Sequence, residues 1–341
     1  MPAYSKISIV IPVLNSGNVL KNCLQSIRSQ NYPQDRVEIL ILDGGSIDET
    51  LSIAKKFSCK IFQNPLKTAE AGKAVGVKSA TGQYIIFIDS DNILPQNNWL
   101  TLMLSPFSTS PEIIGAEPIE FTYRRDAGFI ERYSALLGAN DPYAYFLGNY
   151  DRQSTLSGKW TGLDIPTTEF DNYLLITLHP KKTIPTIGAN GTVFRSEFLK
   201  NNFNGDYLFD IDIITTALNA TSKPIYFAKV KIGIIHTYCE SSISKFIKKQ
   251  SRRIKDIYFY KKIRTYQWQP PLDNKNILFA IYSLLFFPAL FKSIQGYFKL
   301  RDIAWFFHPF ACLITTFIYS FYTLLHLLGF KISQDRQKWH Q

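Results

Sequence analysis

The chain has 341 residues, which is enough for a full hydrophobic core and a second module. Its net charge of +11 fits either nucleic acid or an anionic membrane surface as a partner, and its 15% of aromatic residues gather in the last third. The four cysteines lack the paired spacing of a zinc site or a disulfide framework, which favours reduced thiols in the cytosol. The first residues show no secretory signal.

The first 120 residues alternate between predicted strands and predicted helices. Helices are expected to begin near Ser16, Asp48 and Ala69. This alternation predicts an α/β fold, with a mostly parallel sheet, helices on both faces and ligands at the carboxyl ends of the strands. The strands are expected at Ile7–Val13, Val37–Leu42, Lys60–Phe62, Tyr84–Ile88 and Ile113–Ala116.

Two aspartates follow the fourth predicted strand in the segment Asp89-Ser-Asp91. At the two-residue period of a strand they would point the same way and repel, so a cation or a hydrogen-bonded ligand should lie between them. At the carboxyl edge of a sheet, such a pair suits a divalent metal that carries a phosphorylated substrate. The alternative is a loop that caps the next helix through Asn92, and the segment alone does not decide between the two.

Two other segments lie at the same predicted edge. Asp43, followed by two glycines and Ser46, could form a simple turn, but we favour a ligand role because the glycines let a flat base approach the backbone. Lys73 is either a solvated helix lysine or a contact for a diphosphate. Convergence of these segments on one edge favours a binding site there.

The segments Ser8-Ile-Val-Ile-Pro-Val-Leu-Asn15, Ile41-Leu-Asp-Gly-Gly-Ser-Ile-Asp-Glu-Thr50, Gly72-Lys-Ala-Val-Gly76 and Ala80-Thr-Gly-Gln-Tyr-Ile-Ile-Phe-Ile-Asp-Ser-Asp91 follow one another in the first 120 residues. In order, spacing and chemistry they resemble the family-2 glycosyltransferases of the GT-A (Rossmann-like) fold. The resemblance implies a nucleoside-diphosphate sugar donor, UDP- or GDP-linked, and Mg²⁺ or Mn²⁺.

The resemblance also implies roles for single residues. Asp43 would bind the base, Asp89 would touch the ribose or the donor sugar, and Asp91 would hold the metal on the diphosphate. We expect Asp89 to be a metal ligand as well, together with Asp91. The remaining donor contacts would come from Pro12, Val13, Asn15, Lys73 and Ser90. Two departures from the family pattern, Asp43-Gly44 for a paired aspartate and Lys73-Ala74 for Arg-Asn, leave the nucleotide sugar unspecified.

The second half contains the candidates for the acceptor side. The segment Gly188–Arg195 resembles the acceptor loop of the family, and the irregular stretch before it is either an insertion on the sheet or an acceptor cleft. Asp210 aligns with the catalytic base of the family, although Phe209 replaces the glutamate that usually precedes it. Asp212 is the second candidate, or a first-turn carboxylate favoured by the helix dipole. The base would take the proton of an acceptor hydroxyl as it attacks the anomeric carbon.

His236 ends a predicted strand at a place where relatives often have a histidine near the metal or the diphosphate. A lone histidine there is also commonly structural. Farther along, Gln250 and Arg253 resemble the Gln-x-x-Arg-Trp motif of membrane-embedded relatives, in which the motif closes over the donor and the acceptor. Ile254 takes the place of the tryptophan, so a surface helix explains the match equally well.

The last hundred residues carry membrane signals. Residues 243–263 form a basic amphipathic pattern typical of a helix on an anionic bilayer, with nucleic acid as the competing partner. The segment Ile303–Phe330 contains no Asp, Glu, Lys or Arg and predicts a transmembrane helix, which argues against nucleic acid. Ile277–Phe291 is apolar but short, so it could be re-entrant, interfacial or half of a hairpin.

These observations predict five parts in chain order. They are a nucleotide-sugar half at 1–120, an acceptor half at 121–240, interfacial helices at 241–302, a transmembrane helix at 303–330 and a polar tail at 331–341. We expect a membrane-bound, metal-dependent, inverting glycosyltransferase that faces the cytoplasm and acts on a lipid-linked or glycolipid acceptor. The alternatives are a processive polysaccharide synthase and a non-catalytic membrane scaffold that kept a nucleotide-binding fold.

Overall fold

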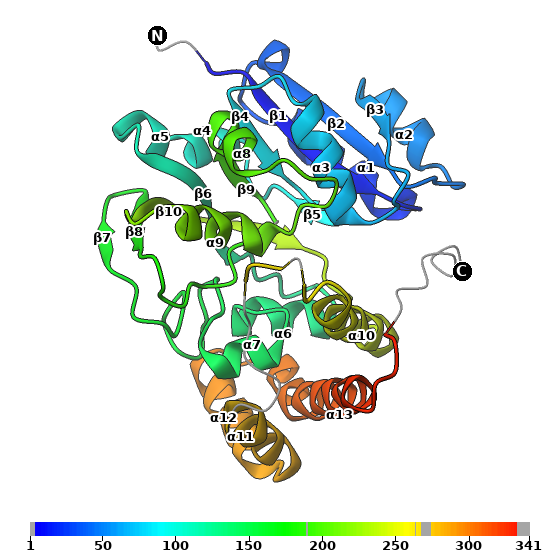
Figure 1. Ribbon diagram of the computed structural model, residues 1–341, viewed down its shortest axis with the longest axis vertical. Coiled ribbons are helices and arrows are strands. Elements are labelled where there is room, and N and C mark those ends of the chain that lie inside the picture. The colour runs from blue at the N-terminus through cyan, green and yellow to red at the C-terminus, as the bar shows by residue number, and fades with distance from the viewer. Residues whose placement is uncertain (1–3, 189, 263, 267–273, 333–341) are drawn as a thin grey trace. The chain divides into compact units, whose positions relative to one another are not determined.

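The computed structural model of the protein describes residues 4–188, 190–262, 264–266 and 274–332 (Figure 1). These residues form two compact units, each assembled from two separate stretches of chain. Unit 1 takes its residues from Met1–Thr122 and Asp164–His236, and unit 2 from Tyr123–Leu163 and Thr237–Gln341. The sequence predicts parts that are each one continuous segment. In the structure, the segment Tyr123–Leu163 belongs to unit 2, and the chain then continues in unit 1 from Asp164 to His236.

Unit 1 consists of a sheet and its covering helices. The strands are β1 (Ile7–Val13), β2 (Val37–Asp43), β3 (Lys60–Gln63), β4 (Tyr84–Phe87), β5 (Asn92–Ile93), β6 (Ile113–Phe121), β7 (Thr167–Glu169), β8 (Tyr173–Leu178), β9 (Thr192–Arg195) and β10 (Ile225–His236). The helices are α1 (Gly17–Arg28), η1 (Gln34–Arg36), α2 (Thr50–Lys56), α3 (Ala69–Ser79), α4 (Trp99–Leu104), α5 (Pro106–Thr109), α8 (Ser196–Asn202) and α9 (Asp210–Ala220).

The sheet has the order β3-β2-β1-β4-β9-β6-β10-β8-β7, and β5 pairs with β10 outside this path. The first four strands run parallel to one another, β9 is antiparallel to β4 and β6, and β10 is parallel to β6. Every residue of β1 and β2 is buried, as expected for strands that helices cover on both faces. The predicted α/β fold with a mostly parallel sheet is confirmed.

Helix α3 packs closely on the sheet because two of its glycines face the strands. A Cβ atom added at Gly76 would collide with the side chain of Val10, and one at Gly72 would lie 3.1 Å from Pro12 Cβ and 3.2 Å from Leu42 Cβ. The Thr68 side chain caps the helix by accepting a hydrogen bond from the third residue of the helix. The first turn of α3 therefore lies against the carboxyl ends of β1 and β2.

Strand β6 is longer than the sequence predicts. We expect a strand that ends at Ala116, because a buried strand rarely continues through a glutamate and a proline. In the structure β6 continues to Phe121, and Glu117 pairs with Lys229 of β10 across an Nζ–Oε1 distance of 2.6 Å. Both side chains are fully buried, so each charge supplies the partner that the other needs.

Unit 2 is built mainly of helices. They are α6 (Phe129–Leu137), α7 (Pro142–Leu147), α10 (Ile243–Phe259), α11 (Asn274–Leu284), α12 (Phe287–Lys299), the short η2 (Ile303–Phe307) and α13 (His308–Leu327). Helix α10 confirms the amphipathic prediction, although it ends at Phe259, and Ile263 lies outside the described residues. The apolar segment that we expect over Ile277–Phe291 is divided between α11 and α12. The division occurs where Phe286 has a φ of 60° and Pro288 opens the next helix.

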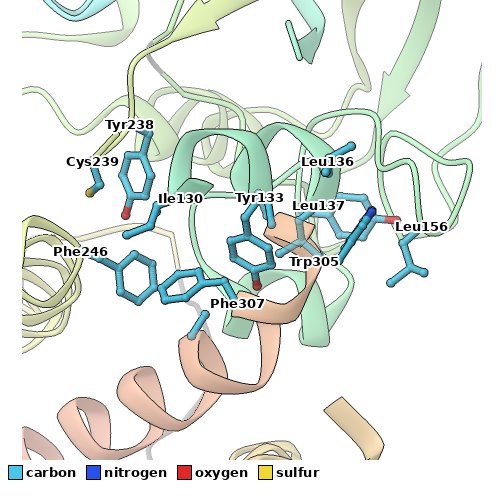
Figure 2. Close-up of a cluster of buried hydrophobic side chains, with 14 residues drawn as sticks. Ile130, Tyr133, Leu136, Leu137, Leu156, Tyr238, Cys239, Phe246, Trp305 and Phe307 are labelled. Carbon is cyan, nitrogen blue, oxygen red and sulfur yellow. The ribbon is translucent and has the colours of Figure 1, made fainter. Parts of the chain in front are cut away.

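An aromatic cluster forms the centre of unit 2 (Figure 2). The Phe307 ring lies 5.4 Å from the rings of both Tyr133 and Phe246, which joins η2 to α6 and α10. Trp305 is fully buried, and Gly296 of α12 makes room for its indole ring. The aromatic residues after β6 thus pack with the C-terminal helices, which explains why Tyr123–Leu163 belongs to unit 2.

One helix in the described part of the chain, Ile303–Leu327, is long and apolar enough to cross a membrane. Helices α11 and α12 pass the same test only as a pair, and they are bent by 76° at the break between them. The C-terminal apolar helix is therefore confirmed as a candidate span by length and composition. The predicted polar tail lies outside the described residues from position 333 onward.

At the end of the sheet opposite the candidate site, the Glu38 carboxylate accepts hydrogen bonds from three neighbouring residues. It accepts from the Ser8 hydroxyl at 2.5 Å, from the backbone N–H and hydroxyl of Thr81 at 2.7 and 2.8 Å, and from Lys60 Nζ at 2.8 Å. Burial raises the pKa of the Glu38 carboxyl, but these donors outweigh burial and lower the pKa to about 2. The charged form of Glu38 therefore joins β1, β2 and the turn before β4.

We predict that Glu38→Gln lowers the free energy of unfolding by about 1–3 kcal/mol at neutral pH, because the charge-assisted hydrogen bonds are lost. The folded-state pKa lies below the ordinary value of 4.5, so this stabilisation is present above that pH and is lost as the pH falls towards 2. Urea unfolding at several pH values measures the difference. The exposed Glu112→Gln is the control, and a pH-independent difference between wild type and Glu38→Gln would contradict the prediction.

Candidate functional site

The loops after β1 and β2 are joined by hydrogen bonds at the carboxyl edge of the sheet. The Asn15 side-chain oxygen accepts from the backbone N–H of Ile47 at 2.9 Å, and Ser46 Oγ accepts from the backbone N–H of Asn15 at 2.9 Å. Asp48 Oδ2 accepts from the backbone N–H of Gly17 at 3.0 Å. Asn15 therefore fixes one loop to the other, whatever it contacts in a bound donor.

Asp43, the last residue of β2, holds the turn that follows it. Its carboxylate oxygens accept hydrogen bonds from the backbone N–H of Gly45 at 3.1 Å and of Ser46 at 3.0 and 3.2 Å. The turn interpretation of Asp43 is confirmed, and contact with a base stays a prediction. Pro12 and Val13 end β1 beside it and are buried.

The two aspartates after β4 do not alternate as strand residues do. The strand ends at Phe87, so Asp89 and Asp91 lie in the following loop and face different basic partners. The expectation that both carboxylates point the same way from a strand is therefore wrong. Asn92 closes the loop, because its side-chain oxygen accepts from the backbone N–H of Asp89 at 2.9 Å. Ser90 Oγ lies 3.2 Å from Ser16 Oγ, which connects this loop to the one after β1.

Lys73 connects two of the candidate carboxylates. Its Nζ lies 2.5 Å from Asp210 Oδ2 and 3.8 Å from Asp89 Oδ1, and its side chain is only 3% exposed. The alternative of a solvated surface lysine is therefore wrong, because the glycines that bring α3 onto the sheet also bury this position. Burial lowers the pKa of the Lys73 ammonium, but Asp210 and then Asp89 raise it well above its usual range. Lys73 thus stays charged.

Asp210, at the start of α9, has the electrostatics of a potential base. Burial raises its pKa from 3.8 to about 6, although the charge and hydrogen bond of Lys73 act in the opposite direction. Its Oδ2 is occupied by Lys73, whereas no hydrogen-bond partner for Oδ1 exists among the described residues. Asp212 lies in the same first turn and is buried, so the structure keeps both candidates close together.

His236 and Asp91 form a second pair. His236 ends β10, and its Nε2 lies 3.5 Å from Asp91 Oδ2. The position of the ring is fixed by the pairing of β10 with β5 and by Phe121, whose ring centroid lies 5.6 Å away. The structure therefore brings together the histidine and one of the aspartates that the sequence assigns to metal binding.

The donor set at this edge suits Mg²⁺ or Mn²⁺, which prefer carboxylate oxygens and accept imidazole. Within the described residues, no group of three or more His, Cys, Asp and Glu side chains could hold a metal ion by itself. Asp91 and His236 therefore fit a cation that takes its remaining ligands from a bound diphosphate and water. They do not fit a closed site made by the protein alone.

Gln250 and Arg253 belong to unit 2. Gln250 is fully buried, and its side-chain oxygen accepts a hydrogen bond from Arg253 Nη1 at 2.8 Å and lies 3.2 Å from the Tyr319 hydroxyl. Arg253 Nη1 also lies 3.2 Å from Asp141 Oδ2. These contacts give the motif a structural role within unit 2, and its contact with a donor stays a prediction.

Sequence reasoning missed two contacts of the site. It did not pair Lys73 with Asp210, because the two residues are 137 positions apart. It also did not connect Asn92 with Asn190, whose side chains meet at 2.9 Å. The only available signal was the Asn-Gly dipeptide at position 190, which is typical of positive φ, and Asn190 has a φ of 45°. Ala189, in the predicted acceptor loop, lies outside the described residues.

Comparison with known proteins supports the interpretation of the fold. The family model described as "Glycosyl transferase family 2" matches residues 8–156. The glycosyltransferase AglE of Haloferax volcanii is 31% identical over 136 residues, which are 38% of this chain and 44% of that protein. The chain therefore spans less than half the length of that relative.

A longer match and a solved structure extend beyond this region. The dolichyl N-acetyl-alpha-D-glucosaminyl phosphate 3-beta-D-2,3-diacetamido-2,3-dideoxy-beta-D-glucuronosyltransferase of Methanococcus voltae is 25% identical over 254 residues, 71% of this chain and 70% of that protein. The mannosyltransferase of Pyrobaculum calidifontis in complex with GDP-Man and Mn²⁺ superposes with a TM-score of 0.55. The superposition has 13% identity and covers 95% of this chain and 88% of that one.

The sheet order, the loops at its carboxyl edge and these similarities agree with one another. The likeness to the Pyrobaculum structure concerns the fold, and the family match covers the segments that form β1, β2, β4 and their loops. Residues 8–156 therefore match the family-2 glycosyltransferases, and the fold of the chain is the GT-A fold.

Proposed function

We propose that the protein transfers a sugar from a UDP- or GDP-linked donor to a lipid-linked acceptor at a membrane. The reaction is a single displacement with inversion, as the resemblance to the family implies. The observation that carries the proposal is the placement of Lys73 between Asp210 and Asp89 at the carboxyl edge of the sheet. This arrangement puts a potential base next to a potential sugar-binding residue, which is what such a transfer needs.

In the proposed reaction, the acceptor oxygen forms a bond to the anomeric carbon while the bond from that carbon to the diphosphate breaks. The acceptor proton passes to Asp210, whose pKa of about 6 suits a base near neutral pH. Lys73 holds Oδ2, which leaves Oδ1 to receive the proton. Oδ1 is covered in the structure, so the acceptor reaches it only after a neighbour shifts. Gly188 is close, since a Cβ added there would lie 3.7 Å from Asp210 Cβ.

A divalent cation bound by Asp91 and His236, with Asp89 as a further candidate, would neutralise the negative charge of the leaving diphosphate. The remaining donor contacts that we propose are those of Pro12, Val13, Asn15, Asp43 and Ser90. These residues lie on the joined loops of the same sheet edge, which supports their assignment to one ligand.

The membrane part of the proposal is supported by unit 2. Helix α10 carries six Lys and Arg residues, which favours an anionic bilayer surface on the cytoplasmic side. Eighteen of the 25 exposed large hydrophobic residues in the described part of the chain lie between Ile277 and Phe330. The name of the Methanococcus relative specifies a dolichyl-phosphate-linked saccharide, so we propose a polyprenyl phosphate, a lipid-linked saccharide or another glycolipid as the acceptor here.

We predict that Asp210→Asn lowers kcat by about 10²- to 10⁴-fold, because the general base is lost. Donor affinity should stay within about threefold of wild type, because the amide still accepts a hydrogen bond from Lys73 and no charge on the donor loops changes. The donor is first identified by thermal shift over UDP- and GDP-sugars with Mn²⁺, and transfer is then measured in detergent with a short lipid-linked saccharide, whose accepting group is a hydroxyl.

Asp212→Asn is the matched control for this experiment. It removes the neighbouring carboxylate of the same helix turn and should retain most of the transfer activity. A larger loss in Asp212→Asn than in Asp210→Asn would reverse the assignment of the base. Donor binding without any transfer by the wild type would favour the scaffold alternative, and long products on a gel would favour the processive synthase.

We also predict that the rate of transfer falls on the acid side with a midpoint near pH 6. Asp210 must be deprotonated to act, and its pKa is raised to about 6. Lys73→Met should move this midpoint to higher pH, because the lysine charge lowers the pKa of Asp210 and is then absent. The pH profile of kcat/KM measures the shift.

Lys78→Met is the control for the pH profile, because Lys78 lies on the same helix and pairs with Asp206 at 2.6 Å on the exposed surface. It should leave the midpoint unchanged. An unchanged midpoint in a folded Lys73→Met variant would contradict an electrostatic contact between Lys73 and the base.

A further inference from the structure

Within unit 2, the apolar helix α13 lies against the basic helix α10 along most of its length. The Phe246 ring of α10 lies 5.4 Å from Phe307, directly before α13. At the other end, Tyr258 of α10 lies 2.7 Å from the Thr323 hydroxyl, and its ring stacks on His326 at a centroid distance of 4.3 Å. The contacts follow the same order along both helices, so the two helices cannot enter the membrane independently.

A polar group around the buried Asp141 and Gln250 side chains fixes the middle of α13 to the same partners. The Tyr319 hydroxyl donates to Asp141 Oδ2 at 2.7 Å and lies 3.2 Å from Gln250 Oε1. Arg253 of α10 completes the group through Asp141. Because separation would leave a charge pair and a hydroxyl without partners, this face of α13 is held by protein and cannot turn towards lipid.

Helix α10 cannot cross the hydrocarbon core. Seven of its seventeen residues are charged, and a Lys, Arg or Asp at the centre of a bilayer is strongly unfavourable. Only one of these charges, Arg253, has its partner in the buried group described above. If α13 crossed the membrane, it would carry α10 into the hydrocarbon core. The free energy needed to bury the charges of α10 there would exceed the free energy gained by burying the apolar face of α13.

The junction between α12 and α13 is bound to residues that follow strand β6 closely in the chain. Asp302 lies 2.8 Å from Arg132 of α6 and accepts a hydrogen bond from the Tyr123 hydroxyl at 2.6 Å. Tyr123 is the first residue after the sheet unit, one position beyond Thr122. A hairpin of two spans would place this junction across the membrane and would break the buried Asp302–Arg132 pair.

The outer faces of α11, α12 and α13 form an apolar surface with a basic border, which we call the leaflet face. Phe287 and Phe298 of α12 are 76% and 77% exposed, and Phe317 of α13 is 62% exposed. Helices α11 and α12 have 11 and 13 residues, so at 1.5 Å per residue each is much shorter than the hydrocarbon core of about 30 Å. The exposed basic residues on these helices and at their ends, which we take as the basic border, are Lys275, Lys292, Lys299, Arg301 and Lys331.

We propose that the leaflet face enters a single leaflet of an anionic phospholipid bilayer, with α13 in the plane of the membrane and no segment crossing it. The basic border selects lipid over a second copy of the chain, because two such faces would bring like charges together. This inference deepens the membrane association proposed above and rests on it, but it does not depend on the sugar or on the base. It replaces the transmembrane helix that the sequence predicts.

The test uses single cysteines at exposed positions of the full-length protein. Cys59 is changed to Ser, because it is the only native cysteine that is not buried. Cysteines are then placed singly at Lys21 in α1, at Arg301 before α13 and at Lys331 after it. Sealed membrane vesicles of both orientations are treated with a maleimide that does not cross membranes. We expect all three positions to react in the same orientation.

Each other labelling pattern overturns the proposal. Opposite orientations for Arg301 and Lys331 would show that α13 spans the membrane. Arg301 opposite to both Lys21 and Lys331 would show a hairpin of two spans. Protein that stays in the supernatant, and is dimeric by light scattering, would show that a second copy covers the leaflet face. Transfer to a short lipid-linked saccharide in detergent is assayed separately, so that failure of the proposed function is distinguished from failure of the topology.

Substitution of the leaflet face provides an independent measurement. Phe287→Glu combined with Phe298→Glu should shift most of the protein from vesicles that contain phosphatidylglycerol to the supernatant, with an unchanged Tm. The control is Phe170→Glu, at an exposed phenylalanine of unit 1, which should leave sedimentation unchanged. Full retention of the folded double variant on the vesicles would overturn the assignment of this surface.

Discussion

A buried ammonium group must have anionic partners, and this requirement organises the candidate site. Lys73 is almost inaccessible to solvent, and its nearest charged groups are Asp210 and Asp89. A lysine in that position without carboxylates would lose its charge or unfold the local structure. The pairing therefore brings together α3, the loop after β4 and the start of α9, three segments that are far apart in the sequence. The glycines at positions 72 and 76 make the pairing possible, because they let α3 approach the strands closely enough to bury the lysine.

The same constraint operates in unit 2 with a different result. Arg253, Asp141, Gln250 and Tyr319 satisfy one another in the interior, and their contacts join α7, α10 and α13. In unit 1 the buried charges prepare a carboxylate for chemistry, whereas in unit 2 they determine how an apolar helix is held. An apolar helix with one face fixed by charged partners has only its other face available to lipid. Hydropathy along the sequence averages over both faces and cannot make this distinction.

Much of the sheet could be predicted because its strands are short apolar runs that end in turn residues. The prediction of β1 at Ile7–Val13 is confirmed residue for residue, and β2 and β3 differ by one position. The predictions failed where a distant partner decides the local structure. β6 continues through Glu117 because Lys229 neutralises it, and that lysine lies on a strand more than a hundred residues later. Likewise, the aromatic residues after β6 could not be assigned to the C-terminal unit, because packing and not local pattern places them there.

In the candidate site, too, the local sequence predicts some features and distant partners decide others. The residues at the ends of β1, β2 and β4 were predictable, because parallel strands end at one edge of a sheet. The resemblance had already placed His236 near the metal of Asp91, but the contact of Asp89 with Lys73 was not predictable, since Asp89 lies beyond the strand and follows the course of a loop. The family resemblance named Asp210, but only the structure pairs its carboxylate with Lys73 and leaves its second oxygen without a partner among the described residues.

Because the Asp210 carboxyl is buried beside Lys73, we expect it to titrate near neutral pH. Carbon-13 NMR of the aspartate side-chain carboxyls measures this directly, with the Asp210 signal identified by its loss in Asp210→Asn. We expect a titration midpoint near pH 6 for this carboxyl. A midpoint close to the ordinary value of 3.8 would contradict it, because it would show that Asp210 is solvated and that the buried pair with Lys73 does not exist in solution.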